Sequence, residues 1–238
     1  MNITITRNNK EYKYKLDKEY STILDALEYI KENIDNTLSY RSCCKSGICG
    51  SCAVIVNESE KLACKSKIDE NDKVKPLKYC KVIKDLVVEI NQIEKLLKEN
   101  KTFIENYSNN LITNDEQKLI NIQSNCILCQ SCYSSCPVVE INKEFKGPYA
   151  LTRSLRYIND KKESNFSNKL DEIQRNGIWD CTLCGNCTLV CPQFIDPKTD
   201  IMNLRMKSIQ NGYSDPNIQN NNFFNEFDFD SGFNPNSF

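Results

Sequence analysis

Cysteine offers the most chemistry in this chain of 238 residues, which contains 14 cysteines and no histidine. The absence of histidine excludes serine–histidine and cysteine–histidine catalysis, histidine zinc sites, Rieske centres and histidine-ligated haem. Twelve of the cysteines form three groups with regular spacing. Their thiolates are the only soft metal ligands that the sequence offers in quantity, so we expect metal binding.

The first group combines a C-x4-C-x2-C loop with a fourth cysteine at a distance; its members are Cys44, Cys49, Cys52 and Cys64. This spacing is typical of plant-type [2Fe–2S] sites. Gly47 and Gly50 permit the unusual dihedrals with which a loop wraps closely around a cluster. Zinc ribbons use two separated C-x2-C pairs instead, so we predict a [2Fe–2S] cluster, with zinc or reduced buried cysteines as the alternatives.

The other two groups repeat one motif, C-x2-C-x2-C-x3-C-P. The first run contains Cys126, Cys129, Cys132 and Cys136, and the second contains Cys181, Cys184, Cys187 and Cys191. In two-cluster ferredoxins the fourth cysteine of each run binds the cluster of the other run. The first predicted [4Fe–4S] cluster is therefore held by Cys126, Cys129, Cys132 and Cys191. The second is held by Cys136, Cys181, Cys184 and Cys187.

Two cysteines lie outside these groups. Cys43 could replace Cys44 as a ligand, but we expect it to be a small packing residue, and we expect Cys80 to be a buried hydrophobe.

Bound clusters would add negative charge, which amide donors and cations normally offset. The candidate cations are Arg41, Lys45, Arg153 and Arg156, although we expect a solvated surface position for each of them.

Charge and hydrophobicity narrow the class of protein further. The 31 basic and 32 acidic side chains give no basic field, so we expect no nucleic-acid partner. Neither a signal peptide nor a membrane-spanning apolar stretch is recognisable, so we expect no transmembrane segment of the chain's own. These features predict a cytoplasmic protein with reduced cysteines, which reaches the cytoplasmic face of a membrane through partner subunits.

Two differently folded parts have to position these cysteines. Residues 1–90 are predicted to form a small sheet packed on a helix. The expected elements are strands at 2–6 and 12–16 joined by a hairpin turn, a helix from Ile23 to Ile34 after a capping box at Thr22 and Asp25, and strands at 53–56 and 82–90.

Residues 91–212 are predicted to form a helical domain that carries both C-x2-C-x2-C-x3-C-P runs. The helical patterns lie at 93–104, 149–158 and 170–178, with prolines suited to a first helical turn at Pro148 and Pro197. Residues 213–238 are rich in asparagine and phenylalanine without a regular period, and we expect a disordered tail there, with a docking segment for a partner as the alternative.

Several segments resemble the iron–sulfur subunit of the succinate dehydrogenase/fumarate reductase family, over about residues 1–210. The matching segments are 24–33, 41–52, 62–65, 76–77, 82–88, 126–129 and 147–148. The resemblance implies an α+β protein in which a plant-ferredoxin-like β-grasp domain precedes an α-helical ferredoxin domain. It also implies an electron-transfer subunit between an FAD-containing flavoprotein subunit, which interconverts succinate and fumarate, and a membrane-anchor or quinone-side partner. No catalytic residue is expected on this chain.

The sequence departs from the usual pattern of that family at two places. Cys184 stands where an aliphatic residue normally leaves three ligands for a [3Fe–4S] cluster, so a second [4Fe–4S] cluster is expected. The tryptophan and histidine of quinone-reactive members are absent here, where the sequence reads Pro137-Val-Val139 and Cys181-Thr182, and Trp179 is expected to pack beside a cluster. Both departures resemble the branch whose partner is a cysteine-rich, heterodisulfide-reductase-like subunit.

Other functions fit parts of the same pattern. One alternative is the iron–sulfur subunit of a glycolate, lactate or glycerol-3-phosphate oxidoreductase, or of heterodisulfide reductase. These enzymes usually lack a plant-type [2Fe–2S] domain. A zinc-binding interaction scaffold is the alternative of a different class, and it would be colourless.

Overall fold

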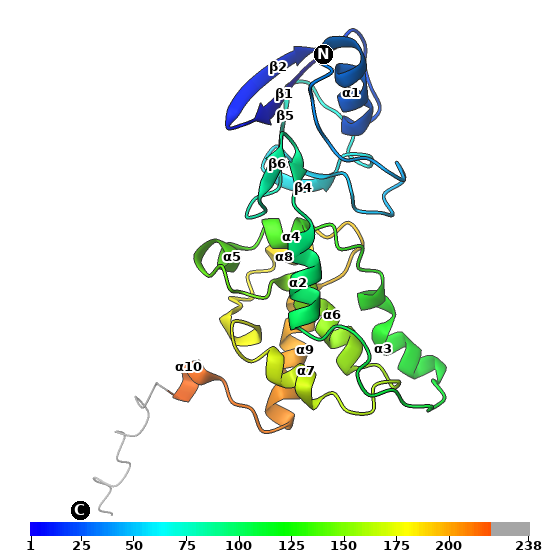
Figure 1. The fold of residues 1–238 in the computed structure, drawn as a ribbon, viewed down its shortest axis with the longest axis vertical. Coiled ribbons are helices and arrows are strands. Elements are labelled where there is room, and N and C mark those ends of the chain that lie inside the picture. Colours follow the sequence, from blue (N-terminus) through cyan, green and yellow to red (C-terminus); the bar gives the residue numbers. More distant parts are fainter. Residues whose placement is uncertain (220–238) are drawn as a thin grey trace, which may run out of the picture.

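The computed structural model describes residues 1–219, in which all strands and helix α1 (Ile23–Tyr29) precede the remaining α-helices along the chain. The strands are β1 (Asn2–Arg7), β2 (Lys10–Lys15), β3 (Ala53–Val56), β4 (Ser59–Leu62), β5 (Asp72–Lys75), β6 (Val82–Lys84) and β7 (Val87–Val88). Figure 1 shows the strands and α1 at one end, the other helices at the opposite end, and α2 (Asn91–Glu99) running from the strands into the helices. This separation confirms the α+β prediction.

The first half is a mixed five-stranded sheet with the order β2-β1-β5-β3-β4. The β1–β5 pair is parallel, and the other pairs are antiparallel. The predicted hairpin of β1 and β2 is confirmed, with Asn8 and Asn9 in the left-handed region at its turn. Helix α1 (Ile23–Tyr29) begins at the predicted capping box of Thr22 and Asp25, and its apolar side shares one core with the buried side chains of the sheet.

Three details of this half differ from the prediction. The sequence patterns of β4 and β5 did not indicate strands, because both are largely polar and bury Glu60 and Asp72. The strand predicted at 82–90 is instead the hairpin of β6 and β7. The predicted helix ends in a π-helical turn (Ile30–Ile34), whose wider winding leaves Ile34 47% exposed rather than on the buried face.

The second half consists of short helices around α6. Its further elements are α3 (Asn114–Ser124), α4 (Ser131–Ser134), α5 (Pro137–Ile141), α6 (Pro148–Ile158), α7 (Ser167–Glu172), a 3₁₀ turn (Ile178–Asp180), α8 (Asn186–Leu189), α9 (Pro197–Gln210) and α10 (Pro216–Gln219). Helix α6 packs against α3 and α9 and buries Leu151 and Leu155. Among residues 1–219, no helix combines the length and the apolar character needed to cross a bilayer.

The helix predictions for this half are partly correct. The pattern at 149–158 is confirmed by α6, and α9 begins at Pro197 as expected. The helix predicted at 93–104 ends at Glu99, and α7 ends at Glu172 instead of continuing to 178. Helix α3 was not predicted. Of the expected tail, residues 220–238 lie outside the described residues, while α10 occupies 216–219.

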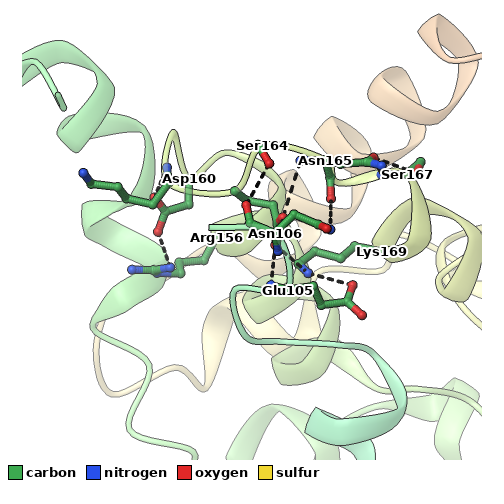
Figure 2. A network of polar contacts seen from close by, with 10 residues as sticks. Glu105, Asn106, Arg156, Asp160, Ser164, Asn165, Ser167 and Lys169 are labelled. Atoms are coloured by element: carbon green, nitrogen blue, oxygen red, sulfur yellow. Dashed lines mark hydrogen bonds and ion pairs between the residues drawn. The ribbon is translucent and has the colours of Figure 1, made fainter. Parts of the chain in front are cut away.

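A buried ion-pair network holds the segment before α3 against the segment before α7 (Figure 2). The Lys169 side chain is fully buried, and its Nζ lies 2.9 Å from Glu163 and 3.1 Å from Glu105. Glu163 also accepts hydrogen bonds from the backbone amides of Glu105 and Asn106. Because the buried carboxylate and ammonium charges neutralise each other, both are tolerated away from water.

Polar contacts hold the two halves together. The Ser134 hydroxyl in α4 accepts a hydrogen bond from the Lys78 amide and donates one to Glu60 in β4, both at 2.8 Å. Farther along, the Gln193 side chain donates to the Gly47 carbonyl at 3.2 Å. The cysteine-rich loop of the first half is therefore fixed against the cysteine-rich runs of the second.

Asp200 in α9 makes the stability of the helical half depend on pH. Its carboxylate accepts hydrogen bonds from Gln123 and Thr152, at 2.8 and 2.9 Å. Burial raises the pKa of Asp200 to about 6, despite these donors, and nearby Asp196 adds to the rise. Because the folded state binds this proton more tightly than the unfolded state, the contribution of Asp200 to stability falls as pH rises from about 4 to 6.

We expect the free energy of unfolding of Asp200→Asn, relative to that of the wild type, to be higher at pH 7 than at pH 5. The increase should be roughly 1 kcal/mol, because only the wild type loses a bound proton between these two pH values. Thermal melting of both proteins at pH 5 and pH 7 measures the difference. A melting-temperature difference that is the same at both pH values would show that Asp200 does not titrate in this window.

Candidate iron–sulfur centres

The sheet positions the first cysteine group. Cys52 directly precedes β3 and Cys64 follows β4, and the β3–β4 hairpin brings them together, with the Ala63 amide donating to the Cys52 carbonyl at 3.0 Å. The remaining members, Cys44 and Cys49, lie in the loop before β3. The fourth cysteine, distant in sequence, is thus brought back beside the loop by the strand register.

Backbone amides of this loop surround the Cys44 sulfur. The N–H groups of Ser46, Ile48 and Cys49 donate to Sγ at 3.5, 3.4 and 3.3 Å. The hydrogen bond from Ser46, followed by the one from Cys49, lowers the pKa of Cys44 to about 5. At Cys52 burial raises the pKa to about 11 instead. The loop therefore stabilises negative charge on its outer sulfur even without a bound group.

The second group is brought together from both runs. Cys126, Cys129, Cys132 and Cys191 line one cavity, whose other walls are mainly apolar. Cys126 and Cys129 lie in the loop after α3, Cys132 lies in α4, and Cys191 follows α8. The structure therefore places three cysteines of the first run beside the last cysteine of the second run.

The third group shows the reciprocal arrangement. Cys136 begins α5 directly after α4, while Cys187 lies in α8, and α4 packs against α8. Burial raises the pKa of Cys136, and the nearby Cys181 and Cys184 raise it further. Burial and the proximity of Cys181 and Cys136 likewise raise the pKa of Cys187 to about 12. Cys136 of the first run thus lies among the first three cysteines of the second run.

The donor chemistry of the two groups in the helical half suits multivalent iron. Burial raises the pKa of Cys126 to about 11 and that of Cys132 well above its ordinary value. Such thiols ionise when a metal supplies positive charge, and [4Fe–4S] clusters are held by four thiolates. Between residues 1 and 219, no three side chains among Cys, Asp, Glu and His are grouped as a single metal ion would need.

Two of the four candidate cations lie beside cysteines. The positive charge of Arg153 acts on Cys126, where it opposes the effect of burial on the pKa of that thiol. Arg41 lines a cavity together with Cys49 and Cys129. The Nε atoms of both arginines are buried and have no hydrogen-bond partner in the described part of the chain. Lys45 and Arg156 instead pair with Glu28 and Asp160.

The residues that lie outside the three cysteine groups differ in how far they are buried. Cys80 is buried, as predicted, and its Sγ lies 3.5 Å from the Gln130 side-chain oxygen. The prediction for Cys43 is wrong, since this side chain is exposed. The loop turns Cys44 toward its own amides and leaves Cys43 on the outer side. Trp179 is buried, and its indole N–H donates to Gln174 at 2.8 Å.

The first two groups meet at Gly50. This residue has φ +72°, and a Cβ atom there would lie 2.9 Å from Cβ of Cys129 and 3.0 Å from the Ile127 carbonyl oxygen. Only glycine allows the loop to come this close to the first run. The sequence suggested a conformational role for Gly50, but it carried no sign of this contact with the second half.

Gly50→Ala is expected to destabilise the contact between the halves, with Gly212→Ala as the matched control. Both glycines have positive φ, but nothing lies within 4 Å of a Cβ atom at Gly212. Each substitution costs about 1–2 kcal/mol in backbone strain, and overpacking adds about 1–3 kcal/mol for Gly50 alone. Thermal melting should therefore rank the wild type above Gly212→Ala and Gly212→Ala above Gly50→Ala. Equal melting temperatures of the two variants would contradict the close approach.

Sequence profiles of two known families match the two halves. Residues 3–95 match a family described as a 2Fe-2S iron-sulfur cluster binding domain. Residues 122–195 match a family described as a 4Fe-4S dicluster domain. These matches contain every cysteine of the three groups.

Named relatives match most of the chain. It is 36% identical over 198 residues to the fumarate reductase iron-sulfur subunit of Escherichia coli O6:H1, covering 79% of this chain and 81% of the relative. It is 33% identical over 211 residues to the mitochondrial succinate dehydrogenase [ubiquinone] iron-sulfur subunit 3 of Arabidopsis thaliana, covering 83% of this chain and 67% of that protein.

A solved structure shares the fold. A chain of the Mycobacterium smegmatis Sdh1 complex in the apo form superimposes with a TM-score of 0.76, covering 90% of this chain and 97% of that chain. The sequence identity of this pair is 20%, so the similarity concerns the fold.

Proposed function

The chain belongs to the family of iron–sulfur subunits of succinate dehydrogenase and fumarate reductase, and on this premise we propose that twelve of its cysteines hold one [2Fe–2S] and two [4Fe–4S] clusters. It is an electron-transfer subunit of an oxidoreductase, and substrate chemistry belongs to the flavin on another subunit. Bound clusters supply one-electron redox chemistry. The residues of this chain hold them, supply donors to their sulfurs and limit the access of water.

The ligand sets follow the three groups. The [2Fe–2S] cluster takes Cys44, Cys49, Cys52 and Cys64. One [4Fe–4S] cluster takes Cys126, Cys129, Cys132 and Cys191, which line one cavity. The other takes Cys136, Cys181, Cys184 and Cys187. The exchange of the fourth cysteine between the runs supports both [4Fe–4S] assignments.

The observation that carries this proposal is the order in which the three groups adjoin. Gly50 brings the first group against Cys129 of the second, and α4 and α8 bring the second group against the third. A linear arrangement of this kind suits a relay of single electrons from one end of the subunit to the other. We also propose a division into a domain of residues 1–90, a domain of residues 91–212 that starts with α2, and a tail of residues 213–238.

Exposed apolar side chains at both ends of this series support partner subunits there. Ile48 is 69% exposed beside Cys49 of the first group, and Leu189 is 85% exposed in α8, the helix that carries Cys187 of the third group. Large exposed apolar side chains beside a functional site are typical of interaction surfaces. We propose an FAD-containing flavoprotein at one end and, at the other, a cysteine-rich, heterodisulfide-reductase-like subunit that holds the complex at the cytoplasmic face of the membrane.

Metal analysis and low-temperature EPR of the purified complex test the cluster content. We expect about ten irons per chain, from 2 + 4 + 4, in a brown protein that dithionite bleaches. A colourless protein containing zinc would contradict the iron–sulfur assignment, and a three-iron signal in the untreated oxidised protein would contradict the second [4Fe–4S] cluster. Co-purification of a flavoprotein that oxidises glycolate, lactate or glycerol 3-phosphate rather than succinate would contradict the proposed partner.

A further inference from the structure

One polar side chain in the cavity of the second cysteine group has no role in the ligand assignment. Tyr149, at the start of α6, lines this cavity together with Cys126, Cys129, Cys132 and Cys191. It is 2% exposed, and its hydroxyl has no hydrogen-bond partner among residues 1–219. A buried hydroxyl without an acceptor costs about 1–3 kcal/mol, so this O–H needs an acceptor in the cavity.

Four cysteines line the same cavity as Tyr149, and no oxygen in the described part of the chain accepts a hydrogen bond from its hydroxyl. Burial raises the pKa of Tyr149, and the largest contribution from a neighbouring group comes from the Cys132 thiol. The ring packs against Tyr133, whose ring centroid lies 5.8 Å away. The Tyr133 hydroxyl points elsewhere, because it accepts a hydrogen bond from the Gln92 side chain. Of the two packed tyrosines, only Tyr149 therefore has a hydroxyl available to the cavity.

We infer that the Tyr149 hydroxyl donates a hydrogen bond to a sulfur of the cluster held by Cys126, Cys129, Cys132 and Cys191 and raises the reduction potential of that cluster. This inference rests on the proposed function. Reduction adds an electron and makes the sulfurs more negative, so a donor stabilises the reduced state more than the oxidised state. Tyr149 thus tunes the reduction potential of the [4Fe–4S] cluster that lies in the middle of the relay.

The test is a redox titration of the full chain in its complex, followed by EPR, with Tyr149→Phe and the matched control Tyr133→Phe. Each variant removes one oxygen atom and no packing carbon. We expect Tyr149→Phe to lower the equilibrium constant for one-electron reduction of this cluster by up to about tenfold, which corresponds to about 59 mV. The two other clusters and Tyr133→Phe should keep the wild-type midpoints.

An unchanged midpoint in Tyr149→Phe, or an equal shift in Tyr133→Phe, would overturn the inference. If Tyr149→Phe does not assemble, Tyr149→Met provides the second variant, because the flexible methionine fills the space without an O–H donor and should lower the midpoint likewise. Failure of the proposed function has a different signature, since a wild type without a [4Fe–4S] signal from this site offers no midpoint to titrate.

Discussion

Cys184→Val is expected to convert the proposed second [4Fe–4S] cluster into a three-iron cluster, visible as a new EPR signal in the oxidised protein. Cys184 is the exposed member of the group that also contains Cys136, Cys181 and Cys187. Its loss leaves three thiolates, which suffice for three irons but not four. The iron content should fall from about ten to about nine per chain. The potential of this cluster should also rise, because one anionic ligand is removed.

Cys43→Ser is the control for this experiment. Cys43 is also exposed and lies outside the proposed ligand sets, so its replacement should change neither the iron content nor the spectrum. An EPR spectrum of Cys184→Val identical to that of the wild type would show that Cys184 is not a ligand. If Cys43→Ser disturbed the [2Fe–2S] signal, the assignment of Cys44 would be wrong instead.

Lys169→Met should be the most destabilising of the substitutions considered outside the cysteine groups. The buried ammonium group faces Glu163 at 2.9 Å and Glu105 at 3.1 Å (Figure 2). Hydrogen bonds from Lys169 and from two backbone amides lower the pKa of Glu163, although burial acts in the opposite direction. Without the lysine, the buried carboxylate is left uncompensated, at a cost of about 3–5 kcal/mol.

Thermal melting measures this effect, and Lys98→Met is the matched control. Lys98 pairs with Glu94 at 2.6 Å on the exposed surface of α2, where an ion pair contributes at most about 0.5 kcal/mol. We expect Lys169→Met to melt on the order of 10 °C below the wild type and Lys98→Met to melt within about 2 °C of it. Similar melting temperatures for both variants would show that the network does not stabilise the helical half.

Local spacing was enough to predict the three cysteine groups. Cysteines three residues apart, as in Cys126, Cys129 and Cys132, are held close by the backbone itself, and repetition of the run suggested the exchange of Cys136 and Cys191. The same local rules predicted the β1–β2 hairpin, the capping box at Thr22 and helix α6, because each depends on neighbours within a few residues.

Elements without an apolar pattern were missed. Strands β4 and β5 are polar, and they are strands because β3 and β1 offer hydrogen-bonding edges to them. Since the β3–β4 hairpin brings Cys64 to Cys52, the sheet pairing completes the first group. Periodicity alone also did not predict the turn at Asp85 that divides residues 82–90 into β6 and β7.

The amino-acid sequence alone determined which cysteines group together and the class of chemistry, because ligand spacing is a property of short segments. The contacts between residues that are far apart in sequence depended on tertiary packing. This packing brought Gly50 against Cys129, placed Tyr149 in the wall of the cavity of the second group, and buried Lys169 between two glutamates. Each of these contacts depends on the position of two backbones that are far apart in sequence, so its energy becomes defined only once the whole chain has folded.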